Sequence, residues 1–295
     1  MKYTELSFDT AKRLLPKRDK DGHKGTFGRA FAYIGSKTFP GAAHLAIEAL
    51  LRGGCGYTEL AGDSELISGM LAKFPEVIYD RISPAELLND KEKQLILEKS
   101  IAASATLIGS GSGCSEVLAR LTEALLSLDT VKPIIIDADA LNSLALYSDA
   151  EAVISNSKRC VILTPHEMEF SRLIGHSPEE IRKNRIKIAE KYAKRLSTII
   201  VLKGHGTIIT DGSETYINPT GTTALSKGGS GDALAGIMTS LVASTDSRPL
   251  DIAALACYIH GLAGDNLAKV YSDFGVTPSD LPREMAKVIR ALSDN

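Results

Sequence analysis

Short apolar segments alternate with longer helical patterns along this chain, and this alternation constrains the fold more than any other feature. Residues 30 to 35 (AFAYIG) are apolar, residues 42 to 53 carry apolar residues at helical spacing, and residues 56 to 60 (GYTEL) form the next short run. Such an order predicts βαβ units and a mainly parallel sheet. Because the runs are continuously apolar, helices should cover both faces of that sheet. Further apolar runs occupy 104 to 109, 133 to 137, 160 to 164 and 197 to 204, and further helical patterns occupy 116 to 128 and 178 to 196.

The alternation of strand and helix patterns ends in the last third of the chain. Residues 206 to 212 (GTIITDG) and 214 to 218 (ETYIN) flank a short turn and predict an antiparallel hairpin. Small and apolar residues at helical spacing then predict interior helices at 231 to 244 and 250 to 269. The chain contains neither a repeat of about 20 to 50 residues nor a linker-like segment. We therefore expect residues 1–295 to form a single α/β domain.

The balance of charge excludes several classes of protein. Acidic residues number 36 against 34 Lys plus Arg, a formal net charge of -2. Surfaces that bind nucleic acid or anionic membranes need a dense excess of Lys and Arg, so we expect neither partner. No apolar run approaches the roughly 18 residues of a membrane span, and the N-terminal segment lacks the apolar stretch of a signal peptide. These features favour a cytoplasmic location.

The cysteines do not form a recognisable motif. All four lie far apart and none belongs to a CxxC pair, which excludes a zinc knuckle or a thioredoxin motif. We expect each of them to be a small buried apolar residue, at Cys55, Cys114, Cys160 and Cys257.

The strongest local motif is KGGSGDALAG at residues 227 to 236, where a loop leads into an apolar helix. Its glycines leave the backbone N–H groups of residues 228 to 231 unobstructed, and the start of the helix adds a positive partial charge. Together these features predict an anion-binding site. Asp232, in the first helical turn, could accept a proton from a hydroxyl beside a bound phosphate. Spacing alone equally allows a glycine turn in which Asp232 caps the helix.

A second glycine cluster, IGSGSGCSE at residues 108 to 116, follows an apolar strand and opens a helix. Parallel α/β sheets bind ligands at this kind of position. Gly109 and Gly111 match the first two positions of GxGxxG, but Cys114 occupies the third, so the cluster is not a dinucleotide fingerprint. The chain also lacks the GxxxxGK[ST] loop, which is the commonest way to hold ATP.

Polar residues follow several predicted strands, at the sheet edge where ligands bind in such folds. Asp137 and Asp139 could stand near a metal-bound phosphate or could cap the next helix. His166 could bind a substrate amide or phosphate, or a loop carbonyl. Lys203 could pair with phosphate or end a strand in solvent. We assign structural roles to the remaining histidines, which have no ligand-like spacing: His23, His44, His176, His205 and His260.

The order of the motifs is more informative than any one of them. The chain closely resembles the ADP- or ATP-dependent NAD(P)H-hydrate dehydratases of the ribokinase-like superfamily, over roughly residues 5 to 290. This resemblance implies a ribokinase-like three-layer sandwich with a central, mostly parallel sheet and helices on both faces. Because the motifs begin at Lys24, we expect a dehydratase domain without the epimerase domain that some members carry. The matching motifs, in order, are KGTFG, SKTFPGAAHLA, GSGSG, DADALN, LTPHEMEF, VLKGHGT, NPTG and KGGSGD.

The resemblance implies the repair of NADH or NADPH that has taken up water across a ring double bond. The ring hydroxyl of the S form is phosphorylated by ADP or ATP with the help of Mg²⁺, and phosphate then leaves. In this reaction Asp232 would act as the base. The backbone amides of Gly228, Gly229, Ser230 and Gly231 would hold the phosphoryl oxygens.

Further residues match family positions that bind the two substrates. Ala42, Gly111 and His166, together with Asp232, match positions for the hydrated dinucleotide, and Asn218 lies at the same edge. The resemblance also suggests a homotetramer, while it leaves the metal ligands open. The positions around the nucleotide correspond to Lys203, Gly204, His205, Gly206, Thr207 and Gly231.

Four loops depart from the usual family pattern. Ser110 stands where a proline is usual, which predicts a less rigid glycine loop. Glu167 and Met168 replace the proline and glycine that normally follow the histidine corresponding to His166. Lys227 adds a charge that we expect near the nucleotide, and NPTGTTAL replaces NPTGNPGMA. The departures remove no chemical group that the reaction requires.

Two alternatives remain open from the sequence. The first is a small-alcohol kinase of the same superfamily, of the hydroxymethylpyrimidine or hydroxyethylthiazole kinase type, which phosphorylates its substrate and stops. The second is an inactive nucleotide-binding sensor. The sequence decides neither between ADP and ATP nor between the hydrates of NADH and NADPH.

Overall fold

The computed structural model describes residues 3–294, and within this range one sheet of ten strands runs through the molecule. Its strand order is β1-β10-β9-β8-β7-β6-β5-β2-β3-β4, and only the pairs β8–β9 and β9–β10 are antiparallel. The predicted mostly parallel sheet and its hairpin are therefore confirmed. The strands are β1 (Thr4–Glu5), β2 (Arg29–Tyr33), β3 (Tyr57–Asp63), β4 (Ile78–Ile82), β5 (Ala105–Ile108), β6 (Ile134–Ile136), β7 (Val161–Leu163), β8 (Ile199–Leu202), β9 (Thr207–Thr210) and β10 (Thr215–Asn218).

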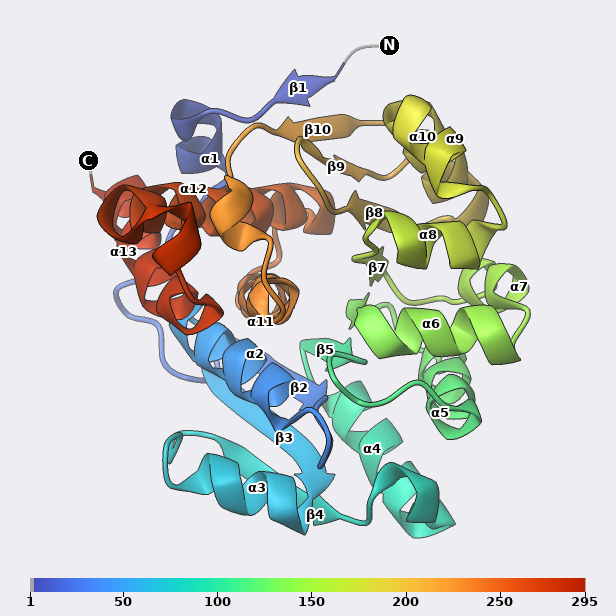
Figure 1. Ribbon diagram of the computed structural model, residues 1–295. Coiled ribbons are helices and arrows are strands. Elements are labelled where there is room, and N and C mark those ends of the chain that lie inside the picture. Colours follow the sequence, from blue (N-terminus) through green and yellow to red (C-terminus); the bar gives the residue numbers. More distant parts are fainter. Residues whose placement is uncertain (1–2, 295) are drawn as a thin grey trace.

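Helices cover both faces of the sheet, as predicted. Figure 1 shows α1, α2 and α11 to α13 on one side and α4 to α10 on the other. Three short 3₁₀ turns complete the described structure: η1 (Ala85–Leu87), η2 (Thr223–Leu225) and η3 (Pro278–Asp280). The helices are α1 (Phe8–Leu14), α2 (Pro40–Arg52), α3 (Ser64–Leu71), α4 (Asp90–Ala102), α5 (Glu116–Leu126), α6 (Ala138–Tyr147), α7 (Ala150–Ser155), α8 (Glu167–Ile174), α9 (Pro178–Lys183), α10 (Arg185–Leu196), α11 (Ser230–Ala243), α12 (Pro249–Gly275) and α13 (Leu281–Ser293).

Each face of the sheet has its own apolar core, because successive strand residues point to opposite faces. In β2, Ala30 and Ala32 belong to the core beneath α2, α11 and α12. Phe31 and Tyr33 belong to the core on the other face, beneath the helices of the middle of the chain. The two cores together account for the continuously apolar strands in the sequence.

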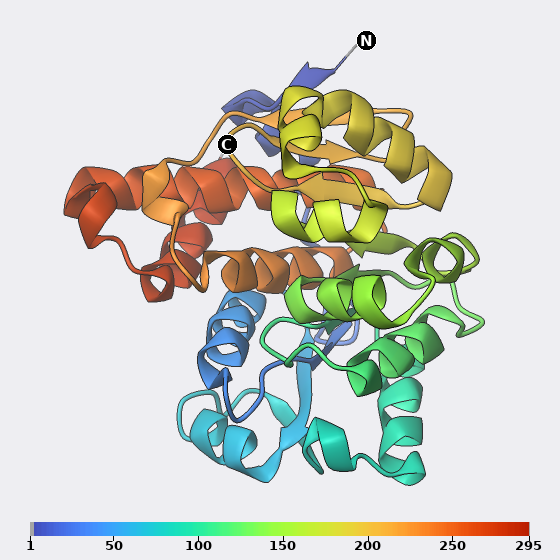
Figure 2. The same cartoon turned by 45° about the vertical axis from the view of Figure 1, so that its right-hand side comes forward.

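Helix α11 is almost entirely buried, and its position determines where Asp232 lies. It packs between α2 and α12, and the approach to α2 is close at Gly236. A Cβ atom at Gly236 would lie 2.0 Å from the Ala46 carbonyl oxygen, so only glycine fits there. The carboxyl end of α12, by contrast, projects from the body of the molecule in Figure 2, and Phe274 at that end is 94% exposed.

Two details, a helix break and the burial of the cysteines, differ from the sequence-based predictions. The helical pattern at 178 to 196 forms two helices, because Asn184 leaves the helical conformation (φ -134°, ψ 34°). Cys114 is exposed rather than buried, and Cys55 and Cys160 are only partly buried. Between residues 3 and 294, no helix is both long and apolar enough to cross a membrane.

Candidate active site

The carboxyl ends of β5, β6, β7 and β8 lie side by side and collect most of the polar residues that the sequence analysis selected. The strand order reverses between β2 and β5, since β3 and β4 extend the sheet in one direction and β6 to β8 in the other. Ligands bind at such reversal points in open parallel sheets. The loop after β5, which contains Gly109 and Gly111, lies at this reversal.

The start of α11 adds a helix N-terminus to this edge. Gly229 is the cap residue and adopts a positive φ of 105°, which favours glycine. Ser230 follows it and is only 5% exposed, and its Oγ has no hydrogen-bond partner among the described residues. The Ser230 N–H donates to the Lys227 carbonyl at 3.2 Å, so this amide is engaged within the loop. The other amides at the helix start remain candidates for an anion.

Asp232 lies in the first turn of α11 and is partly buried. Burial raises the pKa of its carboxyl group to about 7, and the neighbouring carboxylate of Asp137 adds to this rise while the Lys203 ammonium opposes it. A carboxylate whose pKa lies near neutral pH can accept and release protons under physiological conditions. The environment of Asp232 therefore suits a general base.

Lys203 connects α11 with the strand ends. Its ammonium lies 3.0 Å from Asp137 and 3.8 Å from Glu169, and its side chain is 19% exposed. Burial works to lower the pKa of Lys203, but the two carboxylates outweigh it and leave the pKa raised. A Cβ atom at Gly231 would lie 3.4 Å from the Lys203 Nζ. Lys203 is thus a fixed positive charge beside the helix start rather than a strand end in solvent.

Asp137 is the centre of a buried hydrogen-bond network. Its carboxylate accepts hydrogen bonds from the Ser110 hydroxyl at 2.8 Å and the Thr164 hydroxyl at 2.7 Å, besides the one from Lys203. The side chain makes no capping hydrogen bond to α6, so the capping alternative is wrong for Asp137. Ser110 stands where the family usually has proline, and its bond to Asp137 restrains the glycine loop by other means.

Asp139 and His166 bind neighbouring backbone. Asp139 Oδ2 accepts a hydrogen bond from the Gly113 N–H at 2.9 Å. The Nδ1 of His166 caps α8 by accepting from the amides of Met168 and Glu169, and its Nε2 lies 3.2 Å from Glu169 Oε1. Burial, with the charge of Lys203, lowers the pKa of His166. Glu169, buried beneath it, has a raised pKa, first through burial. The His166 ring is half exposed at the sheet edge.

A cavity of about 590 Å³ opens beside the start of α11, and we name it the α11 cavity. It is lined by five of the residues predicted to surround a nucleotide and by the hydroxyl-bearing Ser230; Gly206 is not among its lining residues. Sequence analysis missed Thr220 and the whole α12 side of this cavity, although the NPTG motif was a signal for the former. The lining includes Lys203, Gly204, His205, Thr207 and Gly231 from the predictions, and Asn218, Thr220, Cys257, His260, Gly261 and Asp273 besides.

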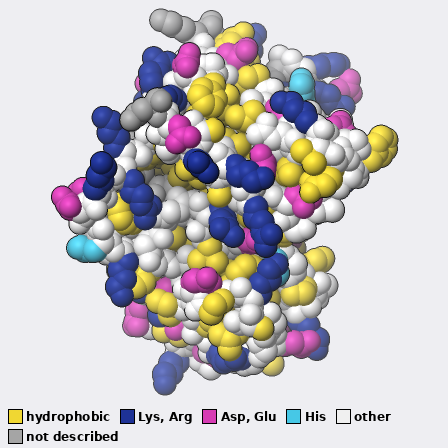
Figure 3. Space-filling model, turned by 90° about the vertical axis from the view of Figure 1, so that its left-hand side faces the viewer, with side chains coloured by type: hydrophobic (Ala, Val, Ile, Leu, Met, Phe, Trp, Pro, Cys, Tyr) yellow, Lys and Arg dark blue, Asp and Glu magenta, His cyan; other side chains and the backbone are white. Residues whose placement is uncertain are grey.

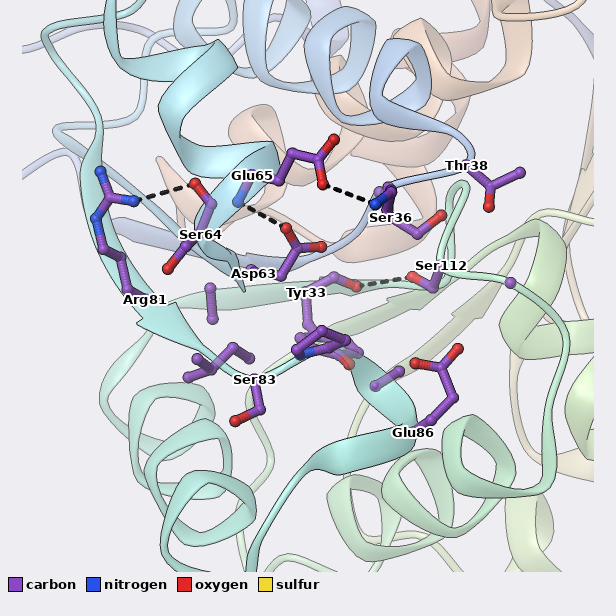
Figure 4. A pocket seen from close by; sticks show the side chains of 18 of the residues that line it. Tyr33, Ser36, Thr38, Asp63, Ser64, Glu65, Arg81, Ser83, Glu86 and Ser112 are labelled. Carbon is purple, nitrogen blue, oxygen red and sulfur yellow. Dashed lines mark hydrogen bonds and ion pairs between the residues drawn. The ribbon is translucent and has the colours of Figure 1, made fainter.

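A larger cavity of about 730 Å³ lies at the ends of β2, β3 and β4, and we name it the β2–β4 cavity (Figure 4). Ser112 and Gly113 of the glycine loop form one side of it, and the Ser112 hydroxyl donates to the Tyr33 carbonyl at 3.4 Å. Ala42 and Gly111 adjoin this side: a Cβ atom at Gly111 would lie 2.5 Å from the Ala42 Cβ. The lining mixes apolar residues with polar ones, and the polar ones include Ser36, Thr38, Asp63, Ser64, Glu65, Arg81, Ser83 and Glu86.

Lys227 does not face either cavity. Its ammonium donates to the carbonyl of Phe274 at 2.7 Å and to that of Val276. The expectation that Lys227 adds a charge near the nucleotide stays a prediction. The Lys227 side chain instead connects the loop before α11 to the end of α12.

A third hollow lies away from the predicted site, on the face formed by α2, α12 and α13. Figure 3 shows many Lys and Arg side chains on this face. Lys73 and Arg283 line the hollow together with the buried Glu48, whose carboxylate lies 3.6 Å and 3.8 Å from them. None of the residues selected from the sequence lies here.

The carboxylates at the sheet edge fit a magnesium ion that is shared with phosphate. Residues 3–294 contain no cluster of three or more His, Cys, Asp or Glu side chains that could hold a metal by themselves. Mg²⁺ in phosphoryl-transfer sites usually takes one or two carboxylates and completes its shell with phosphate and water. The Asp137 carboxylate already accepts hydrogen bonds from three donors, whereas the Asp139 carboxylate accepts one, from the Gly113 N–H.

The fold defines an α/β protein of the ribokinase-like class. A ribokinase-like superfamily protein from Enterococcus faecalis superposes with a TM-score of 0.84 at 26% identity, over 99% of this chain and 97% of that one. A hydroxyethylthiazole kinase from Pyrococcus horikoshii, at 17% identity and a TM-score of 0.58, shares the fold.

The chain belongs to the NAD(P)H-hydrate dehydratase family, whose sequence model matches residues 32–287. The ADP-dependent (S)-NAD(P)H-hydrate dehydratase of Bacillus subtilis is 33% identical over 277 residues, which is 93% of this chain and 92% of that protein. The crystal structure of an ADP/ATP-dependent NAD(P)H-hydrate dehydratase from B. subtilis, grown with ATP and Mg²⁺, superposes with a TM-score of 0.84 at 29% identity over 99% of both chains. The predicted family and fold are thereby confirmed.

The chain spans about half the length of other relatives. A bifunctional NAD(P)H-hydrate repair enzyme from Moorella thermoacetica is 36% identical over 285 residues, which is 95% of this chain and 52% of that protein. The similarity therefore concerns one part of that longer relative.

Proposed function

We propose that this protein removes water from the S form of hydrated NADH or NADPH with cleavage of a phosphate from ADP or ATP. Family membership supports this reaction, and ADP-dependent relatives favour ADP as the donor. One observation of the site supports it most strongly. A carboxylate with a pKa of about 7, Asp232, lies in the first turn of a helix that also presents an unpartnered buried hydroxyl, Ser230.

In the first step, Asp232 accepts the proton of the ring hydroxyl while the hydroxyl oxygen attacks the terminal phosphorus of the nucleotide. The bond from that phosphorus to its bridging oxygen breaks, and AMP leaves when ADP is the donor or ADP when ATP is the donor. The amides of Gly229 and Gly231 and the Ser230 hydroxyl donate to the phosphoryl oxygens. The start of α11 stabilises the negative charge that develops there. Lys203 adds a positive charge held in place by Asp137.

In the second step, the carbon–oxygen bond to the phosphorylated hydroxyl breaks and phosphate leaves, assisted by the lone pair of the ring nitrogen. Loss of a proton from the adjacent ring carbon then restores the double bond. Water is a poor leaving group and phosphate is a good one, which is why a kinase-like site serves a dehydration. A kinase of small alcohols would stop after the first step, and family membership does not favour that alternative.

The two cavities divide the two substrates. The α11 cavity, with Lys203, Gly204, His205 and Thr207, takes the nucleotide. The hydrated dinucleotide enters along Ala42 and Gly111, with His166 at the same edge, and extends toward the β2–β4 cavity. Both substrates then meet at Asp232, which lies between the glycine loop and the α11 cavity.

Mg²⁺ belongs to the same proposal. When bound, it would neutralise charge on the nucleotide phosphates, as hard oxygen-bound cations do in phosphoryl transfer. Asp139 is the side chain that would hold it, which leaves Asp232 free to act as the base. A B. subtilis relative was crystallised with ATP and Mg²⁺, which supports a role for the ion.

We further propose that the protein is a cytoplasmic homotetramer built from one dehydratase domain per chain. A location in the cytoplasm suits a reaction on NADH and NADPH. Size-exclusion chromatography with light scattering measures the assembly directly, and a mass of one chain would contradict the tetramer.

The test of the function is recovery of absorbance at the band of reduced nicotinamide. Purified protein is mixed with hydrated NADH and magnesium, together with ADP, ATP or no nucleotide. We expect recovery only with nucleotide, and the faster of the two identifies the preferred donor. Nucleotide binding without recovery would contradict the proposal and favour the kinase.

A further inference from the structure

His260 is a buried histidine that lines the α11 cavity and that the proposed reaction leaves without a role. It lies on α12 and is 8% exposed. Its Nε2 is 2.9 Å from the carbonyl oxygen of Ser230. A carbonyl oxygen can only accept, so the hydrogen of this bond resides on Nε2. Burial lowers the pKa of the imidazole to about 4, which keeps the ring neutral at physiological pH.

The bond from His260 acts on an amide that the proposed mechanism uses. The carbonyl of Ser230 and the N–H of Gly231 belong to one planar peptide unit, and they point in opposite directions. Gly231 is the second residue of α11, where a helical N–H has no partner within the helix. Holding the Ser230 carbonyl therefore fixes the direction of the Gly231 N–H.

The stretch of α12 that carries His260 also holds the opposite wall of the α11 cavity. The Asn218 amide donates to the Cys257 carbonyl at 3.0 Å, and the Thr220 hydroxyl donates to the Tyr258 carbonyl at 3.3 Å. At Gly261 the packing leaves no room for a side chain, since a Cβ atom would lie 2.2 Å from Thr220 Oγ1. His260 thus extends from a rigid backbone, and its position relative to Ser230 is well defined.

We infer that His260 is a positioning residue for phosphoryl transfer, which orients the Gly231 amide toward the transferring phosphate through its hydrogen bond to the Ser230 carbonyl. This inference rests on the proposed function. A contact that orients a donor for the transition state affects kcat more than the affinity for either substrate.

Two substitutions separate hydrogen bonding from packing. His260→Leu fills much of the same space without a donor, whereas His260→Gln keeps an N–H that can reach a carbonyl. We expect His260→Leu to lower kcat about tenfold, with the KM for hydrated NADH and the Kd for ADP changed by less than about threefold. We expect His260→Gln to keep kcat within about threefold of the unchanged protein. His176→Leu, which removes a distant histidine bound to Tyr192, is the matched control and should keep full activity.

The outcomes distinguish the inference from the proposed function. Equal kcat values for His260→Leu and the unchanged protein would overturn the positioning role, as would equal losses in the Leu and Gln variants. No recovery by the unchanged protein would instead contradict the proposed function. If His260→Leu loses the native circular dichroism spectrum, His260→Asn replaces it, because its shorter side chain does not reach Ser230.

Discussion

The two cavities at the sheet edge differ in the kind of environment they provide. The β2–β4 cavity is the larger, at about 730 Å³, and loops that contain Ser36, Ser83 and Glu86 surround it. The α11 cavity is smaller, at about 590 Å³, but a helix N-terminus, the partly buried Lys203 and the buried His260 converge on it. The smaller cavity therefore combines charge with backbone donors, whereas the β2–β4 cavity has the larger volume.

The glycines near the two cavities also differ in their surroundings. Gly229 and Gly231 stand at the start of a long buried helix, so their amides are held in fixed directions. Gly111 and Gly113 stand in a loop with positive φ values of 65° and 82°. A Cβ atom at Gly111 would lie 2.5 Å from the Ala42 Cβ, whereas no atom lies within 4 Å of a Cβ at Gly113.

The largest expected effect comes from Asp232→Asn. The variant keeps the shape of the site but cannot accept the hydroxyl proton, so we expect turnover of hydrated NADH to fall about 10³-fold. The Kd for ADP, measured by calorimetry, should change by less than about threefold. Unchanged turnover would remove Asp232 from the catalytic role, and a matching loss of ADP affinity would make it a binding residue.

The pH profile of kcat/KM tests the same residue without a substitution. The base must be unprotonated, and the pKa of Asp232 is about 7 instead of the usual 3.8, first because of burial. Activity should therefore fall about tenfold for each pH unit below 7. In Asp139→Asn the inflection should move to lower pH, because the Asp139 charge contributes to the raised pKa of Asp232. A flat profile between pH 5 and 7 would contradict a base with this pKa.

Parallel substitutions of one lysine at each cavity sharpen the comparison. Lys203→Met removes a charge-assisted contact worth about 2 kcal/mol, so we expect the Kd for ADP to rise roughly thirtyfold. Lys37→Met removes an exposed lysine that lines the β2–β4 cavity and pairs with Glu65, and it should leave the Kd for ADP unchanged. Equal effects of the two variants on ADP binding would show that the cavities do not divide the substrates.

The smallest expected effect is on the loop beside the β2–β4 cavity. In Gly111→Ala the new Cβ would collide with Ala42, and we expect the KM for hydrated NADH to rise about tenfold with no change in ADP affinity. Gly113→Ala is the control, because its φ is also positive but no atom lies within 4 Å of the new Cβ. A similar KM in both variants would attribute the effect to backbone strain rather than to the collision.

The sequence predicts the central architecture because it depends on local patterns. The apolar strands, the hairpin at β9 and β10 and the glycine-rich start of α11 all lie where the patterns place them. The edge strand β4 was not predicted, since Ile78–Ile82 (IYDRI) contains two charged residues and only one buried position. The helix break at Asn184 was not predicted either, because the apolar spacing continues through both α9 and α10.

The sequence also indicates which residues meet at the site, but not how they are bonded. Asp137 and Lys203 were each selected with two open alternatives, and their ion pair depends on the neighbouring order of β6, β7 and β8. His260 is brought to the α11 cavity by close packing of α12, which no short motif expresses. A histidine in a helix of otherwise small and apolar residues was the signal available for His260.

The most direct test of the account is the stoichiometry of a single reaction mixture containing hydrated NADH, ADP and magnesium. Inorganic phosphate and restored reduced nicotinamide are measured together over time. The account predicts one phosphate released for each nicotinamide restored, and neither product without nucleotide. Accumulation of a stable phosphate ester without recovery of nicotinamide absorbance would contradict it and assign the α11 cavity to a kinase.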